Sequence, residues 1–248
     1  MKKILYTFGG WFILTLIWFI VTHFEIINPH ILPTPKKVLN AFIDLVKNDD
    51  LFTNIMFSLK INFLGYFESI LFALPVGFAL GLSKNIRKMF SMPIDSLRFV
   101  PITALSGVFV AISGLGLMTK VHFLAFGIWV YLVPVIVQRI DEIPLTQRQM
   151  MQTLGASRWQ MFYHLEWKSV ISRLSDDVRI LVGISWTYII VAELKNIEGG
   201  LGSLIFLGEK QGIIGKVYVC VIIIIVIGML QDKIFKWLDK KLFKFKHV

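Results

Sequence analysis

The sequence predicts an all-α membrane protein with six transmembrane helices, forming a single domain over residues 1–248. Hydrophobic residues make up 56% of the chain and charged residues only 17%, and the mean hydropathy is +0.70. Apolar runs of about twenty residues, the length that crosses the hydrocarbon core of a bilayer, recur along the chain. A soluble domain of this size would carry more charge on its surface, so we exclude that class.

The N-terminal third predicts a first span and then a helix at the membrane surface. Residues 6–24 follow a basic start, but the run is long and aromatic and has no small-residue cleavage site, so we expect an uncleaved span. After it, Pro35 suits the first turn of a helix. Apolar residues then recur at helical spacing and predict an amphipathic interfacial helix. They are Val38, Leu39, Phe42, Ile43 and Val46.

Five more spans are expected downstream, at residues 61–82, 101–117, 122–137, 178–194 and 213–230. The second span contains small residues that let a neighbouring helix approach closely, namely Gly65, Gly77 and Gly81. The third is short and interrupted by glycines, and we expect a tight turn at residues 118–120. The stretch 195–211 is expected to be a glycine-rich connection.

Six spans place both termini on one side of the membrane, and the distribution of Lys and Arg indicates which side. Eighteen of the 26 fall on the side of the termini and seven on the opposite side, with Lys60 near a span end. Basic residues concentrate in cytoplasmic loops, so we predict cytoplasmic termini and a cytoplasmic loop at about residues 138–177. The asymmetry also explains the net charge of +10 without nucleic acid, because the basic tail can bind anionic lipid headgroups.

The sequence gives no sign of a metal, redox or cofactor site in this chain. Cys220 is the single cysteine and lies in an apolar run, so it can form neither an intramolecular disulfide nor a cysteine metal site. The five histidines are scattered without a metal-binding spacing. There is no phosphate-binding loop, and GGLG at residues 199–202 precedes no GK[ST]. Any ATP hydrolysis is therefore expected on a separate polypeptide.

The predicted cytoplasmic loop contains a glycine between two short amphipathic stretches. Gly155 permits a left-handed turn there, so residues 149–165 can form a compact knob. Such a knob can sit in the groove of a partner protein, or it can rest on the lipid headgroups. The residue pattern alone favours neither interpretation.

The loop and the two segments after it resemble the inner-membrane permeases of ABC importers, in particular the nitrate, sulfonate and taurine family. The loop positions that match are Thr153, Leu154, Gly155, Ala156, Ser157, Arg158, Trp159, Gln160 and Phe162. Further matches are Arg179, Gly183, Trp186, Ala192, Glu193, Gly200, Leu201 and Gly202. In that family a glutamate-alanine-alanine loop with a fixed glycine docks into the nucleotide-binding subunit. Gln149 stands where the family has the glutamate, which removes a charge from the docking surface.

The resemblance implies a type I ABC importer transmembrane domain in a bacterial inner membrane. It implies two ATPase subunits that carry the ATP, a second permease copy, most simply an identical one, and an extracytoplasmic solute-binding protein. The implied activity is alternating access for a small solute of the nitrate, sulfonate or taurine-like anion class. A bicarbonate or thiamine-precursor permease, or one half of a heteromeric pair, stays open as an alternative.

Three residues within the spans are candidates for the translocation path. Glu68 is an acid deep inside a span, where carboxylates usually face a cavity or a partner. Trp186 could line the path, although an aromatic residue at helical spacing more often serves packing. Glu193 matches a family position at the outer end of the fifth span, where it could shape a gate or form a structural pair.

The alternative function from a different class of protein is an intramembrane serine protease. Ser106 and Ser113 lie in the third span, but such an enzyme needs a histidine base on a nearby span. The fifth and sixth spans contain no histidine, and His122 is expected near the outer end of its helix. These serines are therefore interpreted as small packing residues.

Overall fold

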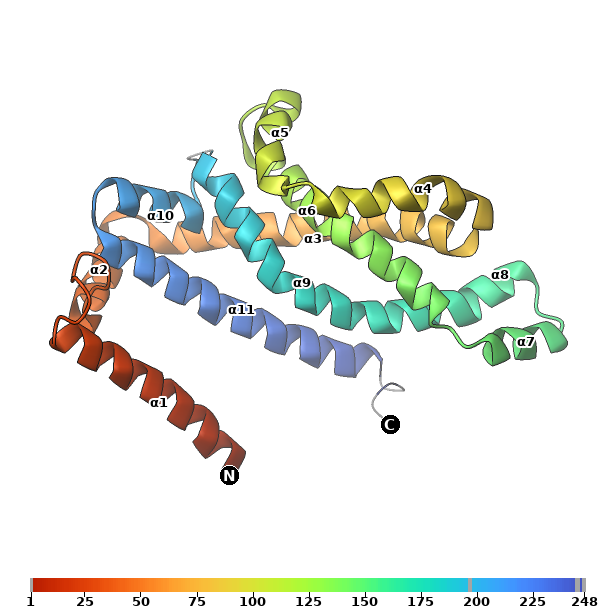
Figure 1. Ribbon diagram of the computed structural model, residues 1–248, viewed down its shortest axis with the longest axis horizontal. Coiled ribbons are helices and arrows are strands. Elements are labelled where there is room, and N and C mark those ends of the chain that lie inside the picture. The colour runs from red at the N-terminus through yellow and green to blue at the C-terminus, as the bar shows by residue number, and fades with distance from the viewer. Residues whose placement is uncertain (1, 196–197, 244–245, 247–248) are drawn as a thin grey trace.

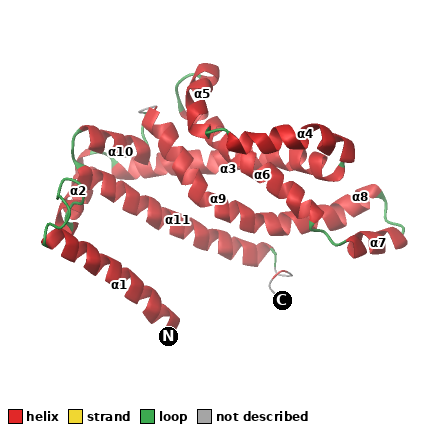
Figure 2. Ribbon diagram, viewed as in Figure 1, coloured by secondary structure: helices red, strands yellow, loops and turns green. Residues whose placement is uncertain are grey.

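The computed structural model describes residues 2–195, 198–243 and 246, and within them every regular element is a helix (Figure 2). The N-terminal half contains α1 (Lys2–His23), α2 (Pro35–Asn48), α3 (Leu51–Leu82), α4 (Lys84–Ser96), α5 (Ser106–Ser113) and α6 (Leu117–Asp141). The C-terminal half contains α7 (Leu145–Thr153), α8 (Arg158–Met161), α9 (Lys168–Lys195), α10 (Leu201–Lys210) and α11 (Ile214–Leu242). Helices α3, α6, α9 and α11 form the body, with α2 and α10 at one end and α7 and α8 at the other (Figure 1).

The closest helix pair is α3 with α6, and glycines make this approach possible, as the sequence predicted. A Cβ atom added to Gly65 would lie 2.6 Å from the Leu124 side chain, and one added to Gly77 would lie 2.6 Å from Ile136. Gly81 meets Ile140 in the same way one turn further on. Because van der Waals contact drives helix association in lipid, this seam of small residues stabilises the pair.

Three described helices are long and apolar enough to cross a membrane, namely α3, α6 and α11. A fourth span results if α4 and α5, with their short 3₁₀ extensions, are taken as one segment bent by 91°. Within the described residues α1 offers a shorter apolar stretch, Gly9–His23, and α9 is a 28-residue helix with a charged first half. The predicted total of six spans remains a prediction.

The third span predicted at residues 101–117, short and interrupted by glycines, was wrong in one respect, because Gly107 lies inside α5 and does not interrupt it. The chain turns sharply at Val100, whose extended conformation is the one favoured before a proline, here Pro101. The α-helix that follows, α5, has only eight residues. It ends at Gly114, which adopts a φ of +75°.

The predicted turn at residues 118–120 was also wrong, because these residues belong to the first turn of α6. Lys120, one of the seven basic residues counted on the side opposite the termini, is only 1% exposed. Its Nζ atom lies 3.4 Å from the carbonyl oxygen of Gly199 and 4.7 Å from the centre of the Phe57 ring. The carbonyl oxygen and the ring face therefore stabilise the ammonium group of Lys120 inside the bundle.

The predicted amphipathic helix is present as α2, and the Thr34 hydroxyl caps its N-terminus. The predicted apolar side was assigned to the membrane interface, and a largely different side packs against the bundle. The buried residues are Val38, Ala41 and Leu45. Four of the five predicted apolar positions are exposed instead, namely Leu39, Phe42, Ile43 and Val46. The helix is fixed to α11 by Lys216, whose Nζ atom lies 2.8 Å from Asp44 and 2.6 Å from Asp49.

Two further segments are more helical than predicted. The stretch 195–211 is not a simple connection, because it contains α10, whose first five residues are buried. The sixth predicted span continues beyond residue 230 as α11 and carries part of the basic tail to Leu242. Residues 196–197 of the connection and 244–245 and 247–248 of the tail lie outside the described residues.

Candidate functional site

The candidate coupling segment forms a protruding knob at the end of the molecule opposite α2 and α10 (Figure 1). It consists of α7, a turn at residues 154–157, and α8. Two short helices at a glycine were predicted here, and Gly155 has the left-handed φ of +73°. Because a side chain strains this conformation, glycine suits the position. Of the nine predicted coupling residues, Phe162 is the first residue of the π-helical segment that follows the knob. The other eight lie in the knob and are Gln149, Thr153, Leu154, Gly155, Ala156, Ser157, Arg158 and Trp159.

A capping box begins the second half of the knob. The Ser157 hydroxyl accepts a hydrogen bond from the backbone N–H of Gln160 at 3.3 Å. The Gln160 side chain in turn accepts one from the backbone N–H of Ser157 at 2.8 Å. Reciprocal bonds of this kind satisfy the free N–H groups at a helix start, so they define where α8 begins.

The knob exposes apolar side chains that no described part of the chain covers. Leu154 is 76% exposed and Trp159 is 71% exposed. Phe162 provides the anchor to the bundle, since its ring lies 5.2 Å from that of Phe78 on α3. The Phe78 ring also stacks on Trp167 at 5.5 Å. An exposed apolar tip on a packed aromatic base is a surface suited to a protein partner.

The predicted loop at residues 138–177 is mostly helical. Helix α6 continues to Asp141, and a π-helical segment, Phe162–Trp167, joins α8 directly to α9. The non-helical connections are therefore short, and movement of the knob would be transmitted directly into α9. The backbone hydrogen bonds of α6, α8 and α9 thus continue through a stretch whose polar composition did not predict a helix.

Ion pairs fix the base of the knob to the helices. The guanidinium of Arg139 donates hydrogen bonds to Asp177 at 2.8 and 2.6 Å and to Glu142 at 2.7 Å. The bond from Arg139 holds the pKa of Glu142 below its usual value. Burial raises the pKa of Glu166, and the guanidinium of Arg148, 3.5 Å away, opposes that shift.

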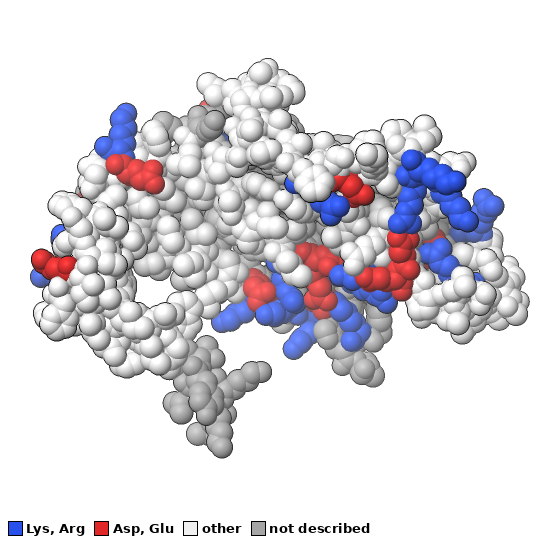
Figure 3. Space-filling view, viewed as in Figure 1, with Lys and Arg blue, Asp and Glu red and all other residues white. Residues whose placement is uncertain are grey.

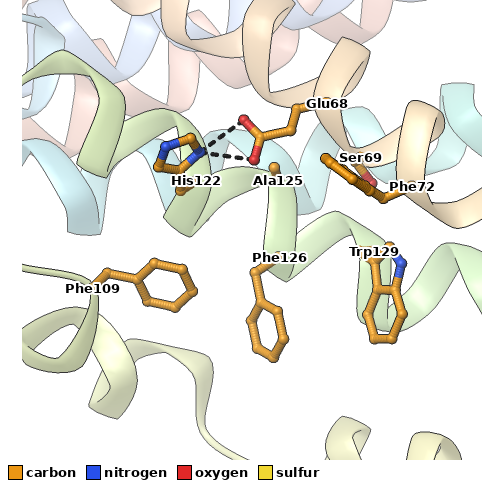
Figure 4. A pocket seen from close by; sticks show the side chains of 8 residues that line it. All are labelled: Glu68, Ser69, Phe72, Phe109, His122, Ala125, Phe126 and Trp129. Carbon is orange, nitrogen blue, oxygen red and sulfur yellow. Dashed lines mark hydrogen bonds and ion pairs between the residues drawn. The ribbon is translucent and has the colours of Figure 1, made fainter. Parts of the chain in front are cut away.

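A second candidate site lies between α3, α6 and α5, around Glu68. The Nδ1 atom of His122 is 2.8 and 2.9 Å from the two carboxylate oxygens of Glu68 (Figure 4). The pair borders a cavity of about 320 Å³ whose other walls include the rings of Phe109, Phe126 and Trp129. Sequence reasoning selected Glu68 but missed this partner. The signal was present, because His122, Phe126 and Trp129 recur at helical spacing and share one face of α6.

Trp186 lies inside the bundle and is not among the residues that line this cavity. Its indole Nε1 donates a hydrogen bond to Gln231 on α11 at 2.8 Å. Gln231 donates to Asn62 on α3 at 3.1 Å, and Asn62 donates to Ser185 at 3.0 Å. This polar chain joins three helices, as interhelical hydrogen bonds do in membranes.

Glu193 is 0% exposed and holds the start of α10. One carboxylate oxygen accepts a hydrogen bond from the Ser58 hydroxyl at 2.6 Å, and the other accepts one from the backbone N–H of Gly202 at 2.7 Å. Ser58 also accepts from the N–H of Leu201 at 2.9 Å. These bonds satisfy N–H groups at a helix N-terminus, where a negative charge is favoured.

The arrangement gives no support to a serine protease. The Ser106 hydroxyl donates a hydrogen bond to the carbonyl of Thr103 at 2.9 Å, and the His122 ring is engaged by Glu68. No Ser–His hydrogen bond occurs among the residues that the structure describes. Over the same residues, no group of three His, Cys, Asp or Glu side chains could hold a metal ion.

Comparisons with known proteins agree with the helical bundle. The chain is 25% identical over 209 residues to TauC of Escherichia coli (strain K12), a taurine transport system permease protein, covering 82% of this chain and 76% of TauC. It is 24% identical over 236 residues to SsuC of Bacillus subtilis (strain 168), a permease protein assigned to aliphatic sulfonates transport, covering 93% of this chain and 84% of SsuC. A formylaminopyrimidine transport permease protein, ThiX of Halalkalibacterium halodurans, is 25% identical over 178 residues, covering 71% of this chain and 70% of ThiX.

The fold itself is that of ABC transporter membrane domains. An amino acid ABC transporter crystallised with histidines matches with a TM-score of 0.65 at 16% identity, covering 81% of this chain and 98% of that one. The methionine transporter MetNI, in an inward-facing conformation, matches with a TM-score of 0.63 at 18% identity, covering 75% and 94%.

These features define a membrane permease of the ABC transporter class. Residues 70–244 match the family described as the binding-protein-dependent transport system inner membrane component. The chain belongs to this family. It is a divergent member, with about 25% identity to its curated relatives.

Proposed function

We propose that this chain is the transmembrane subunit of an ATP-driven importer that moves a small solute across the bacterial inner membrane by alternating access. The observation that carries this proposal is the knob of α7 and α8, with its exposed Leu154 and Trp159. An ATPase subunit would bind the knob of each of two permease copies. Because α8 continues into α9, closure of the ATPases would move a helix of the bundle.

The orientation proposed from the sequence is supported by the distribution of charge on the surface. Lys and Arg gather on the part of the visible face that carries α4, α8 and the end of α11, and they are few near α2 and α10 (Figure 3). Basic residues favour the cytoplasmic side, so the knob and both termini would lie in the cytoplasm. The extracytoplasmic binding protein would then meet the end that carries α2 and α10.

Among the three predicted path residues, Glu68 has the surroundings that suit a path. It borders a cavity together with His122, whereas Trp186 and Glu193 are hydrogen-bonded in the packed interior. Trp186 and Glu193 would act by holding α9, α10 and α11 in position. The solute class we propose is that of small sulfonates and related anions or zwitterions, as for TauC and SsuC. A thiamine-precursor solute, as for ThiX, and a heteromeric pair of permeases remain the competing candidates.

Affinity purification of the tagged chain from gently solubilised native membranes tests this function. We expect an ABC ATPase in stoichiometric amounts, together with ATP hydrolysis that responds to a solute-binding protein. The Gly155→Arg variant should insert into the membrane and lose the ATPase. A wild-type chain that purifies without any ATPase would contradict the proposal.

A further inference from the structure

The cavity beside α3, α6 and α5 has a charge character that bears on which solute it accepts. Eight residues line it, and only Glu68 and His122 among them are ionisable (Figure 4). The remaining lining residues are neutral, and four of them are aromatic. They are Ser69, Phe72, Phe109, Ala125, Phe126 and Trp129.

The geometry of the pair limits the charge of the cavity. Nδ1 of His122 lies within 2.9 Å of both carboxylate oxygens of Glu68, so an ionised carboxylate accepts a hydrogen bond from this nitrogen. With a neutral imidazole the pair carries one negative charge. With a charged imidazole the pair is neutral. In neither state is the lining of the cavity positive.

Two further features suit a ligand that donates hydrogen bonds. Ser69 is 1% exposed, and its hydroxyl has no hydrogen-bond partner in the part of the chain that the structure describes, although it lines the cavity. A buried hydroxyl without a partner costs free energy that a bound polar group would recover. The Phe126 ring lies 6.2 Å from that of Trp129 and nearly parallel to it, and 5.6 Å from that of Phe109. Aromatic faces attract ammonium groups.

We propose that this cavity binds the amino group of an organic solute, with its N–H donors on the Glu68 carboxylate and its carbon skeleton against the Phe and Trp rings. The inference rests on the proposed importer function and narrows its solute class. An amino-bearing zwitterion or amine fits, whereas a bare inorganic anion such as nitrate or bicarbonate would meet a lining that carries no net positive charge in either state of the imidazole. The volume of about 320 Å³ is at the lower end for ligand pockets and suits a small molecule.

Pairs of probes that differ only at the amino group test this directly. The permease is purified with its ATPase and placed in nanodiscs of phosphatidylglycerol, which has no amine. Binding is then measured by calorimetry for taurine against isethionate, β-alanine against 3-hydroxypropionate, and 4-aminopyrimidine against pyrimidine, with nitrate and bicarbonate as inorganic probes.

In at least one pair we expect the amino compound to bind about tenfold or more tightly, since a site built for an N–H donor rejects an analogue that lacks it. Glu68→Gln should abolish that preference, and Glu209→Gln, a change of an exposed acid on α10, should preserve it. Phe126→Leu should weaken the amino compound several-fold, which keeps the test informative if Glu68→Gln does not fold.

Three results would overturn the inference: no pair discriminates, an inorganic anion binds as tightly as the best probe, or Glu68→Gln leaves the preference intact. Phosphatidylethanolamine that displaces the best probe would also overturn it, because the amine would then belong to a lipid headgroup. Failure of the importer function is recognised separately, since no ATPase would co-purify.

Discussion

The carboxylate of Glu193 accepts a hydrogen bond from the backbone N–H of Gly202 at 2.7 Å and so joins the end of α9 to the start of α10. The same carboxylate accepts from Ser58 on α3. One buried acid therefore connects three helices at the end of the bundle away from the knob. These bonds support a structural role for Glu193 rather than contact with the solute.

Glu193→Ala should destabilise the protein by about 2 kcal/mol or more, because it leaves the Ser58 hydroxyl and the Gly202 N–H buried without acceptors. Glu193→Gln keeps one acceptor and should cost less. The measurement is the unfolding temperature of both purified variants in detergent. Equal stability of the alanine variant and the wild type would show that these bonds do not hold α10.

Gly155→Arg should abolish solute-stimulated ATP hydrolysis while leaving the protein inserted and folded. A Cβ atom at this position would meet no other atom of the chain within 4 Å, so the damage would fall on the docking surface and on the local φ of +73°. Gly155→Asn is the matched control, because Asn tolerates the left-handed conformation. Unchanged coupling in the arginine variant, measured in proteoliposomes, would rule out docking through this knob.

Trp159→Ala should weaken binding of the ATPase about 30-fold without lowering the unfolding temperature. A large exposed aromatic residue at the tip of a docking surface is the type of side chain that dominates interface energies, typically by about 2 kcal/mol or more. Trp237→Ala provides the control, since Trp237 is also exposed but belongs to α11 and not to the knob. Titration of the purified ATPase against each variant measures the affinity. An equal loss of affinity in both variants would show that Trp159 has no specific role in docking.

Gly77→Ala should destabilise the α3–α6 seam by about 1–3 kcal/mol, because the added methyl group would overlap the side chain of Ile136. Gly228→Ala on α11 meets no atom within 4 Å and should be neutral or slightly stabilising. Thermal unfolding of the two variants in the same detergent compares them. A stable Gly77→Ala variant would mean that the seam can open without cost.

Acid should weaken the base of the knob through Glu142. The hydrogen bond from Arg139 lowers the pKa of Glu142 in the folded protein. A depressed carboxyl pKa contributes stability that is present above the unfolded value of about 4.3 and is lost as the pH falls through the folded value. The fall in unfolding temperature between pH 7 and about pH 3 should therefore be smaller in Glu142→Gln than in the wild type. An identical fall in both proteins would show that Glu142 does not contribute.

Predictions from local sequence were accurate where a single residue determines the local geometry. Gly155 permits a left-handed turn and Pro35 suits the first turn of a helix, and both features are present. Predictions of where helices end were less accurate. The sequence around residues 118–120 and 166–177 is polar, yet both stretches are helical, and several of their side chains find partners inside the protein. Lys120, for example, is satisfied by Gly199 far along the chain.

The chain by itself determined the class of this protein, because span length and hydropathy depend only on the order of residues and the thickness of a bilayer. It also determined the glycine-containing knob, since Gly155 and its capping box act over a few residues. Only the tertiary structure decided which side of α2 is buried, that Glu193 holds α10, and that His122 meets Glu68 across 54 positions. The physical reason is that these contacts join segments distant in sequence, and no local pattern records which helices pack together.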